Sequence, residues 1–412
     1  MDDNTRPPKK RYAILIAGMI IQLCAGVIYM WAVFRAPVAE YLERSPTDIA
    51  LVSSIMLSAF VIGILIGGTL QDRLGPKIIA ILGSAIMSIG IISTSFVTPS
   101  SADLIFLTYG IIGGLGVGIV YLCTVACVQK WFPDKRGFAT GAMVGAFGFS
   151  LVIFAPITKN LLENVGVPET FRTIGIAFMI VCVGASILLS NPPKGYVVSG
   201  AIAKKNSDQK QFTPKEMVRT KSFYLISGSL FFILPAYFIL NPNLVALAAD
   251  RGFSGYAELG VMITGVFSAT GRLLITWLSD KTGRISALLL ITLMTAIGII
   301  ALTFATGFLF LACVAMISLA FGGASGTYAA VTADNFGTKN MGTNYGLVTL
   351  GFGASALIFP FLSNAISVPG DFTNPFILAA LTCAIAFILV LMLRSIGNKR
   401  TNDSDLNVNI NS

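Results

Sequence analysis

The sequence predicts an all-α membrane protein with twelve transmembrane helices in two pseudo-symmetric bundles of six. Of the 412 residues, 55% are hydrophobic and only 11% are charged, whereas soluble domains carry about 25% charge. The apolar residues form long runs, and a run of about 20 residues crosses roughly 30 Å of hydrocarbon. Motifs from the first half of the chain also recur in the second half, which indicates an internal duplication.

The apolar runs define twelve expected spans. They are 12–35, 49–71, 78–97, 103–130, 137–160, 171–190, 222–249, 257–278, 286–305, 308–333, 341–366 and 373–395. Between the sixth and seventh spans, residues 191–221 carry seven Lys and Arg residues and few apolar ones. We expect this segment to be a cytoplasmic linker between an N-terminal bundle (1–190) and a C-terminal bundle (222–395). The remaining residues, 396–412, are predicted to be a disordered cytoplasmic tail.

The basic residues predict the orientation of these spans. Of the 28 Lys and Arg residues, 22 lie at the chain ends and in the even-numbered connections. Five lie in the odd-numbered connections, when residues at the ends of spans are counted with the adjoining connection, and one, Arg272, lies in the interior of a span. Because positive charge concentrates on the cytoplasmic side, we expect a multi-pass protein of the cell membrane (inner or plasma) with both termini cytoplasmic. The net charge of +9 is explained by these loops, so membrane lipid is an expected partner and nucleic acid is not.

The composition also argues against an enzyme. The chain contains no histidine, which excludes His-based catalysis, His-ligated metals and a histidine proton relay. All six cysteines fall inside apolar runs, where they are expected to be small buried side chains. Since no set of nucleophile and base is present, we expect no catalytic residues, no cofactor and no metal site.

Three patches of the first half recur in the second half in the same order. The loop Asp72-Arg73-x-Gly75-x-Lys77 is echoed 208 residues later by Asp280-Lys281-x-Gly283-Arg284. Gly116 and Tyr121 correspond to Gly323 and Tyr328. A third patch, which includes Gly137, Phe147 and Ser150, returns 205 residues later as Gly342, Phe352 and Ser355. Parallel six-helix repeats are typical of transporters in which two halves rock around a site at the membrane midplane.

The duplicated loop resembles the signature between helices two and three of the major facilitator superfamily. Its carboxylate can meet the N-terminus of a neighbouring helix and basic partners, which would stabilise one conformation. The glycine permits a tight turn. We therefore predict a conformational latch made of Asp72, Arg73, Lys77, Asp280, Lys281 and Arg284.

Two further stretches narrow the resemblance. Residues 131–137 and 334–346 are similar to the corresponding parts of the oxalate–formate antiporter family and the related monocarboxylate transporters. The similarity covers the transmembrane body and leaves out the tails and the linker. It implies the major facilitator fold and a carrier like the bacterial lactate-type monocarboxylate transporters.

Arg272 is the strongest candidate for a substrate ligand. It lies eight residues before Asp280, about 12 Å from the cytoplasmic end of its helix and near the bilayer midplane. A charge there is costly and usually marks a pathway or a binding site, although a snorkelling or structurally paired arginine is the alternative. None of the 19 acidic residues falls in the central part of a predicted span. We therefore expect the partner of Arg272 to be an anion that binds and dissociates. A planar guanidinium suits a carboxylate, and the resemblance implies that this arginine binds the substrate carboxylate.

Two positions depart from the patterns of the related families. Ser268 stands where proton-coupled monocarboxylate transporters have an aspartate, one turn before the arginine. Phe352 stands where oxalate carriers have a lysine as a second cation. One cation matches one carboxylate, and a second anionic group beside an apolar wall would be desolvated without a partner. We therefore predict a small monocarboxylate such as lactate or pyruvate, with Phe352 and Phe147 as apolar walls.

Further polar side chains are candidates to complete the site. A tyrosine hydroxyl can donate a hydrogen bond to a carboxylate or a 2-hydroxyl, although packing between helices is the alternative role for each. The candidates are Tyr29, Tyr121, Tyr328, Asn241 and Asn243, with Ser268 beside them.

The predicted function is secondary active transport by a monomer through alternating access, with protons as the expected co-substrate. The alternative is an anion exchanger of the oxalate–formate type. A proton-driven drug exporter is a third reading, disfavoured because such carriers need a titratable acid within the membrane.

Overall fold

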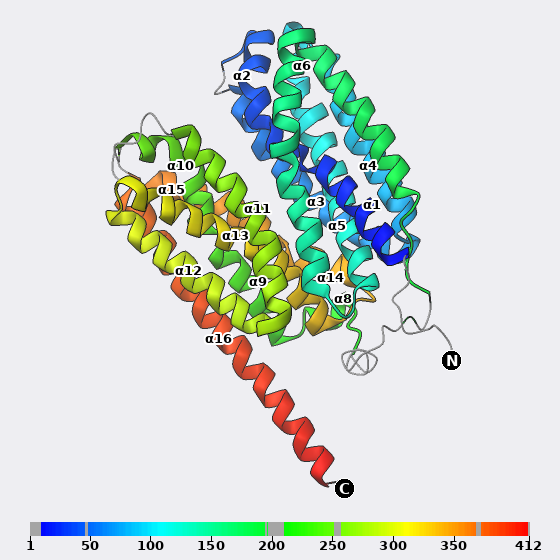
Figure 1. Ribbon diagram of the computed structural model, residues 1–412, viewed down its shortest axis with the longest axis vertical. Helices are drawn as coiled ribbons and strands as arrows, with labels where there is room; N and C mark the ends of the chain where they lie inside the picture. The colour runs from blue at the N-terminus through cyan, green and yellow to red at the C-terminus, as the bar shows by residue number, and fades with distance from the viewer. Residues whose placement is uncertain are drawn as a thin grey trace. The chain divides into compact units, whose positions relative to one another are not determined.

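The computed structural model describes residues 10–45, 48–193, 196, 210–250, 257–367 and 372–410. The regular structure within these ranges is entirely helical (Figure 1). Ten helices among the described residues are long and apolar enough to cross a membrane. These observations confirm the predicted class, an all-α membrane protein.

The chain forms two compact units. Unit 1 consists of Met1–Phe212 together with Phe336–Leu347. Its main helices are α1 (Lys10–Ala25), the 3-10 helix η1 (Gly26–Met30), α2 (Trp31–Tyr41), α3 (Leu51–Leu74), α4 (Pro76–Thr94), the π-helix η4 (Phe106–Gly113), α5 (Gly114–Trp131), α6 (Arg136–Ser186) and most of α14 (Met341–Val348).

Unit 2 consists of Thr213–Asn335 together with Val348–Ser412. Its helices are α8 (Pro214–Met217), α9 (Lys221–Ile233), α10 (Pro235–Asp250), α11 (Ala257–Thr282), α12 (Arg284–Phe304), α13 (Gly307–Phe336), α15 (Leu350–Ile366) and α16 (Thr373–Ile410). The first boundary between the units lies between Phe212 and Thr213. The segment Phe336–Leu347 comes from the second repeat in sequence but groups with unit 1.

The helix α6 contains two of the predicted spans, 137–160 and 171–190, in one run of 51 residues. Its only non-helical backbone is at Gly166, where φ is 78°, a conformation that side chains other than glycine rarely adopt. Pro168 follows two residues later, and the Thr170 hydroxyl donates to the Gly166 carbonyl. Figure 1 shows the two arms of α6 meeting at this turn. A single glycine therefore makes the connection for which the sequence predicts a ten-residue loop.

Two other predicted spans are each divided into two helices. The span 222–249 becomes α9 and α10, because Pro235 lacks the N–H that a continuing helix needs and begins a new helix instead. The span 341–366 becomes α14 and α15 with an interruption at Thr349. There the Ser227 hydroxyl donates to the Val348 carbonyl at 3.3 Å.

The helix α16 extends past its predicted end at 395 and continues to Ile410. The sequence instead predicts a disordered tail from 396, since Asn, Asp and Ser favour helix ends and turns over helix interiors. A helix that is already formed lengthens without repeating the cost of nucleation. Continuity with the apolar part of α16 therefore accounts for the difference.

Glycines bring the helices of unit 1 into backbone contact. A Cβ atom on Gly116 of α5 would overlap the Met87 backbone of α4. A Cβ on Gly118 of the same helix would overlap the Phe60 carbonyl oxygen of α3. Small residues at such contacts allow transmembrane helices to approach closely. The helix α5 is thereby fixed between α3 and α4.

Candidate functional site

Arg272 lies on α11 in unit 2 and is only 4% exposed. Ser268, one turn earlier, is also buried. Gly322 of α13 packs directly against this stretch, because a Cβ atom there would overlap the Ser268 carbonyl oxygen and lie 3.0 Å from the Arg272 backbone nitrogen. On the neighbouring turn of α11, a Cβ on Gly271 would overlap the Leu319 carbonyl oxygen of α13. The main chain that carries Arg272 is therefore held rigidly against α13.

Four aromatic side chains form a cluster in unit 2, here called the unit 2 aromatic cluster: Tyr237, Phe238, Phe321 and Phe352. Tyr237 of α10 stacks on Phe321 of α13 with ring centroids 3.7 Å apart and planes 7° from parallel. Phe352 of α15 meets Phe238 edge-on at 5.4 Å and Phe321 at 6.5 Å. The half-buried ring of Phe352 therefore packs within a cluster of aromatic side chains.

The unit 2 aromatic cluster connects to the segment that carries Arg272. Phe321 directly precedes Gly322, the residue whose backbone abuts Ser268 and Arg272. The Phe352 ring in turn packs against the Phe321 ring. A buried cation and an aromatic cluster thus both belong to unit 2, and the residues Phe321 and Gly322 are adjacent in α13. The sequence analysis identifies Phe352 but misses Tyr237, Phe238 and Phe321, because apolar aromatics inside a span carry no signal that separates a wall from packing.

A second aromatic cluster lies in unit 1 and contains three of the predicted site residues. Tyr121 of α5 lies 4.9 Å from Phe147 of α6, and Tyr29 of η1 lies 5.3 Å from Phe147. Phe60 of α3, which the sequence analysis misses, completes this unit 1 aromatic cluster at 5.3 Å from Tyr121. The structure thus brings Tyr29, Tyr121 and Phe147 together.

Buried hydrogen bonds hold the unit 1 aromatic cluster in place. The Gln22 amide of α1 donates to the Tyr121 carbonyl at 2.9 Å and to the Thr124 hydroxyl at 2.8 Å. The Tyr109 hydroxyl donates to the Val27 carbonyl at 3.0 Å, within the 3-10 helix that carries Tyr29. These bonds fix the main chain on both sides of the cluster.

Two of the three remaining candidates, Tyr328 and Asn243, form hydrogen bonds within the protein. Tyr328 is 1% exposed, and its hydroxyl donates to the Ser229 hydroxyl of α9 at 2.9 Å. The Asn243 amide donates to the Ile239 carbonyl within its own helix, while Asn241 is exposed. The Tyr328 hydroxyl and the Asn243 side-chain amide therefore already donate hydrogen bonds to other groups of the protein in this conformation.

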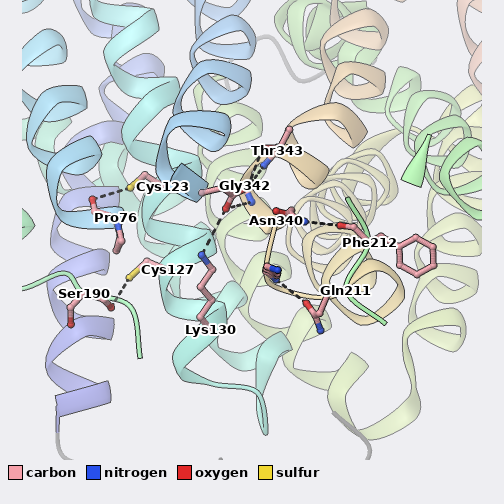
Figure 2. A network of polar contacts seen from close by, with 12 residues as sticks. Pro76, Cys123, Cys127, Lys130, Ser190, Gln211, Phe212, Asn340, Gly342 and Thr343 are labelled. Carbon is pink, nitrogen blue, oxygen red and sulfur yellow. Dashed lines mark hydrogen bonds and ion pairs between the residues drawn. The ribbon is translucent and has the colours of Figure 1, made fainter. Parts of the chain in front are cut away.

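The first of the two predicted latch loops holds the start of α14. The Asp72 side chain is 7% exposed and accepts hydrogen bonds from the Gly342 N–H at 3.3 Å, the Thr343 N–H at 2.9 Å and the Thr343 hydroxyl at 3.1 Å. Lys130 lies 3.8 Å away (Figure 2). A carboxylate at a helix N-terminus satisfies free N–H groups and interacts favourably with the helix dipole. Asp72 therefore contacts both a helix N-terminus and a lysine, whereas Arg73 and Lys77 are exposed.

The charges of the second latch loop pair with groups on α11 and α13. Arg284 forms ion pairs at 2.7 Å with both Asp280 and Asp334, and it also donates to the Ser279 hydroxyl. Lys281 lies over the Trp277 ring at 4.1 Å. The duplicated loops therefore have similar turns but different partners.

The similar turns depend on glycine in both loops. Gly75 has a φ of 87° and Gly283 a φ of 89°, values that favour glycine. The partners Lys130, Thr343 and Asp334 are missing from the predicted latch. They lie between 50 and 271 residues away in sequence, beyond what a local motif can indicate.

Membrane-spanning helices, a duplicated charged turn and a buried arginine are features of a membrane transporter and not of an enzyme. The model of the Major Facilitator Superfamily matches residues 14–360 and 292–407. The chain belongs to this superfamily, as its motifs predict.

Known relatives and a solved structure agree with this assignment. The chain is 26% identical to the oxalate:formate antiporter of Oxalobacter formigenes, over 92% of this chain and 90% of the relative. It is 25% identical to monocarboxylate transporter 13 of Rattus norvegicus, over 92% and 88% respectively. The crystal structure of the transporter FucP in the outward conformation has the same fold, with a TM-score of 0.72, 17% identity and coverage of 93% of this chain and 98% of that one.

Proposed function

We propose that the protein is a secondary transporter of small monocarboxylates such as lactate or pyruvate and that it carries one anion together with one proton. In this proposal Arg272 binds the carboxylate. The proposal also places the protein in the cell membrane as a monomer with both termini in the cytoplasm, on the basis of the charge distribution in its loops.

The observation that carries this proposal is the burial of Arg272 beside the rigid contact with α13. A buried guanidinium costs several kcal/mol to desolvate, even after relaxation. Such a charge within a membrane is usually retained for a pathway or a binding site. A carboxylate matches its planar fork of donors and would offset the cost through two charge-assisted hydrogen bonds.

The aromatic clusters support a substrate with a short apolar tail. Phe352 contacts other rings and supplies no charge. A monocarboxylate presents one charged end to the arginine and an alkyl end to such a wall. The same proposal includes two sets of residue roles. The further substrate-binding residues are Tyr29, Tyr121, Phe147, Tyr328, Asn241, Asn243 and Ser268. The latch residues are Asp72, Arg73, Lys77, Asp280, Lys281 and Arg284.

Uptake into proteoliposomes tests the role of Arg272. Arg272→Lys and Arg272→Ala should fold, yet bind radiolabelled lactate or pyruvate at least about tenfold more weakly, because an ammonium cannot reproduce two parallel hydrogen bonds. The matched control is Arg394→Ala, which removes an exposed arginine from α16 and should transport normally. Near-native substrate affinity in Arg272→Ala would remove the central element of the proposal.

An anion exchanger of the oxalate–formate type is the second candidate. It is favoured by the similarity to the oxalate:formate antiporter and by Ser268, which stands where a proton-accepting aspartate would support symport. Transport should respond to an imposed inward proton gradient if the proposed symport is right. Uptake that ignores this gradient but accelerates when substrate is preloaded inside the vesicles would establish exchange instead.

A further inference from the structure

The segment Phe336–Leu347 is held on unit 1 from two directions. In sequence it belongs to the second repeat, and α14 leads on through Thr349 to α15 of unit 2. Asp72 holds the first turn of α14 from one side. The end of the linker holds the same segment from another side, through residues that no motif in the sequence marks.

The contact made by the linker consists of Gln211 and Phe212 (Figure 2). The Phe212 N–H donates to the Phe336 carbonyl at 2.9 Å. The Phe212 carbonyl accepts from the side-chain amides of Asn340 at 3.0 Å and Asn344 at 3.1 Å. The Gln211 side-chain oxygen accepts from the Lys339 backbone N–H at 3.0 Å.

The shapes of the two segments also fit each other. The Phe212 and Phe336 rings meet edge to face, 5.6 Å apart and 84° from parallel. Gly337 has a φ of 81°, and a Cβ atom there would overlap the Gln211 side chain. Only glycine leaves room for the Gln211 amide while adopting this backbone conformation. The linker end and the segment therefore form a matched pair of surfaces.

We propose that Gln211 and Phe212 act as a clasp that holds Phe336–Leu347 on unit 1 in one state of the transport cycle and releases it in the other. Repeats of six helices move largely as bodies during alternating access. A segment of the second repeat that is held on unit 1 must therefore detach when the second repeat moves. The linker end thus sets the balance between the two states together with Asp72.

The chemistry of the clasp suits reversible release. Gln211 and Lys339 are exposed and Phe212 is half-buried, so water can replace the hydrogen bonds when the segment leaves. Each such bond contributes only modestly to stability. The inference does not depend on which anion is carried, because the clasp contains none of the proposed substrate ligands.

A cysteine reporter at Gln71 measures the release. Gln71 is 0% exposed, and its side-chain oxygen lies 2.8 Å from where a Cβ atom on Gly342 would be, so departure of the segment uncovers this position. The six native cysteines are buried, and the protein without the reporter gives the background labelling. The full-length Gln71→Cys protein is placed in lipid nanodiscs and labelled with a polar maleimide.

The clasp predicts a specific order of labelling rates. Gln211→Ala should accelerate labelling about fivefold, the effect of losing one hydrogen bond from the closed state. Asn340→Ala, which weakens the clasp from the opposite side, should also accelerate it. Gln211→Glu keeps an oxygen acceptor for the Lys339 N–H and should label at the parent rate. The control Lys215→Ala, which changes an exposed residue of α8, should do the same. Asp72→Asn serves as a positive control for release.

Two results would overturn the proposal. The first is an unchanged labelling rate in both Gln211→Ala and Asn340→Ala while Asp72→Asn accelerates labelling. The second is equal acceleration in Gln211→Ala and Gln211→Glu, which would show that the hydrogen bond to Lys339 does not hold the segment. An unchanged thermal unfolding midpoint in each variant shows that faster labelling reports release and not unfolding.

Discussion

Replacing Phe352 by lysine tests the proposal that this position sets the substrate class. The native ring contacts Phe238 at 5.4 Å and Phe321 at 6.5 Å, and each aromatic pair contributes about 0.5–1.5 kcal/mol beyond buried area. Losing both should weaken the apolar wall by about 1–3 kcal/mol. Lactate affinity should therefore fall by roughly fivefold to 150-fold, since 1.4 kcal/mol corresponds to a factor of ten.

The same substitution should strengthen the binding of a dicarboxylate. In the native protein the second carboxylate of oxalate would face an aromatic wall, and dehydrating that charge costs several kcal/mol. We therefore expect the native protein to discriminate against oxalate by about two orders of magnitude. The lysine variant supplies a second cation. Its discrimination against oxalate relative to lactate should therefore be at least about tenfold smaller than that of the native protein.

Competition of oxalate and lactate against labelled lactate measures both effects. Phe352→Leu is the matched control, because it keeps an apolar wall without a charge and should retain the monocarboxylate preference. Equal binding of oxalate and lactate by the native protein would refute the reasoning. So would a lysine variant that shows no shift towards oxalate, since Phe352 would then serve only in packing.

Two further predictions concern Tyr328 and the membrane topology. Tyr328→Phe should lower the free energy of unfolding by about 1 kcal/mol, because it removes the hydrogen bond to Ser229, and should change the KM for uptake less than about twofold. A large loss of substrate affinity at unchanged stability would instead make Tyr328 a substrate ligand. Single cysteines introduced across 194–215 should react with an impermeant thiol reagent only after the inner face is exposed, and labelling of intact cells from outside would reverse the predicted orientation.

The sequence predicts the helical architecture well, because each span needs a long apolar run and the repeat preserves local motifs. It also assigns Tyr29, Tyr121 and Phe147 to one site. In the structure the Phe147 ring lies 5.3 Å from the Tyr29 ring and 4.9 Å from the Tyr121 ring. Tyr121 and Phe147 both lie in patches that recur in the second half of the chain, so the repeat is a usable signal for them.

The partners of the charged residues could not be predicted in this way. Asp72 is recognised from its loop, but Thr343 depends on how two distant helices meet. The donor role assigned to Tyr328 overlooks Ser229, which lies 99 residues earlier. Nothing in either local sequence encodes that contact. Local patterns thus identify which residues are chemically capable, while tertiary packing decides which of their hydrogen-bonding groups are already used.

The glycine contact between α11 and α13 has a practical consequence for redesigning selectivity. Gly271 and Gly322 leave no room for even one methyl group, so a mutational library that includes them would consist mostly of damaged proteins. Phe321 and Phe352 are adjacent to the same region but project rings that smaller side chains could replace. A library restricted to these two positions would sample the shape of the wall while the scaffold around Arg272 stays intact. Selection for growth on acids with longer alkyl chains would then act on the shape of the wall alone.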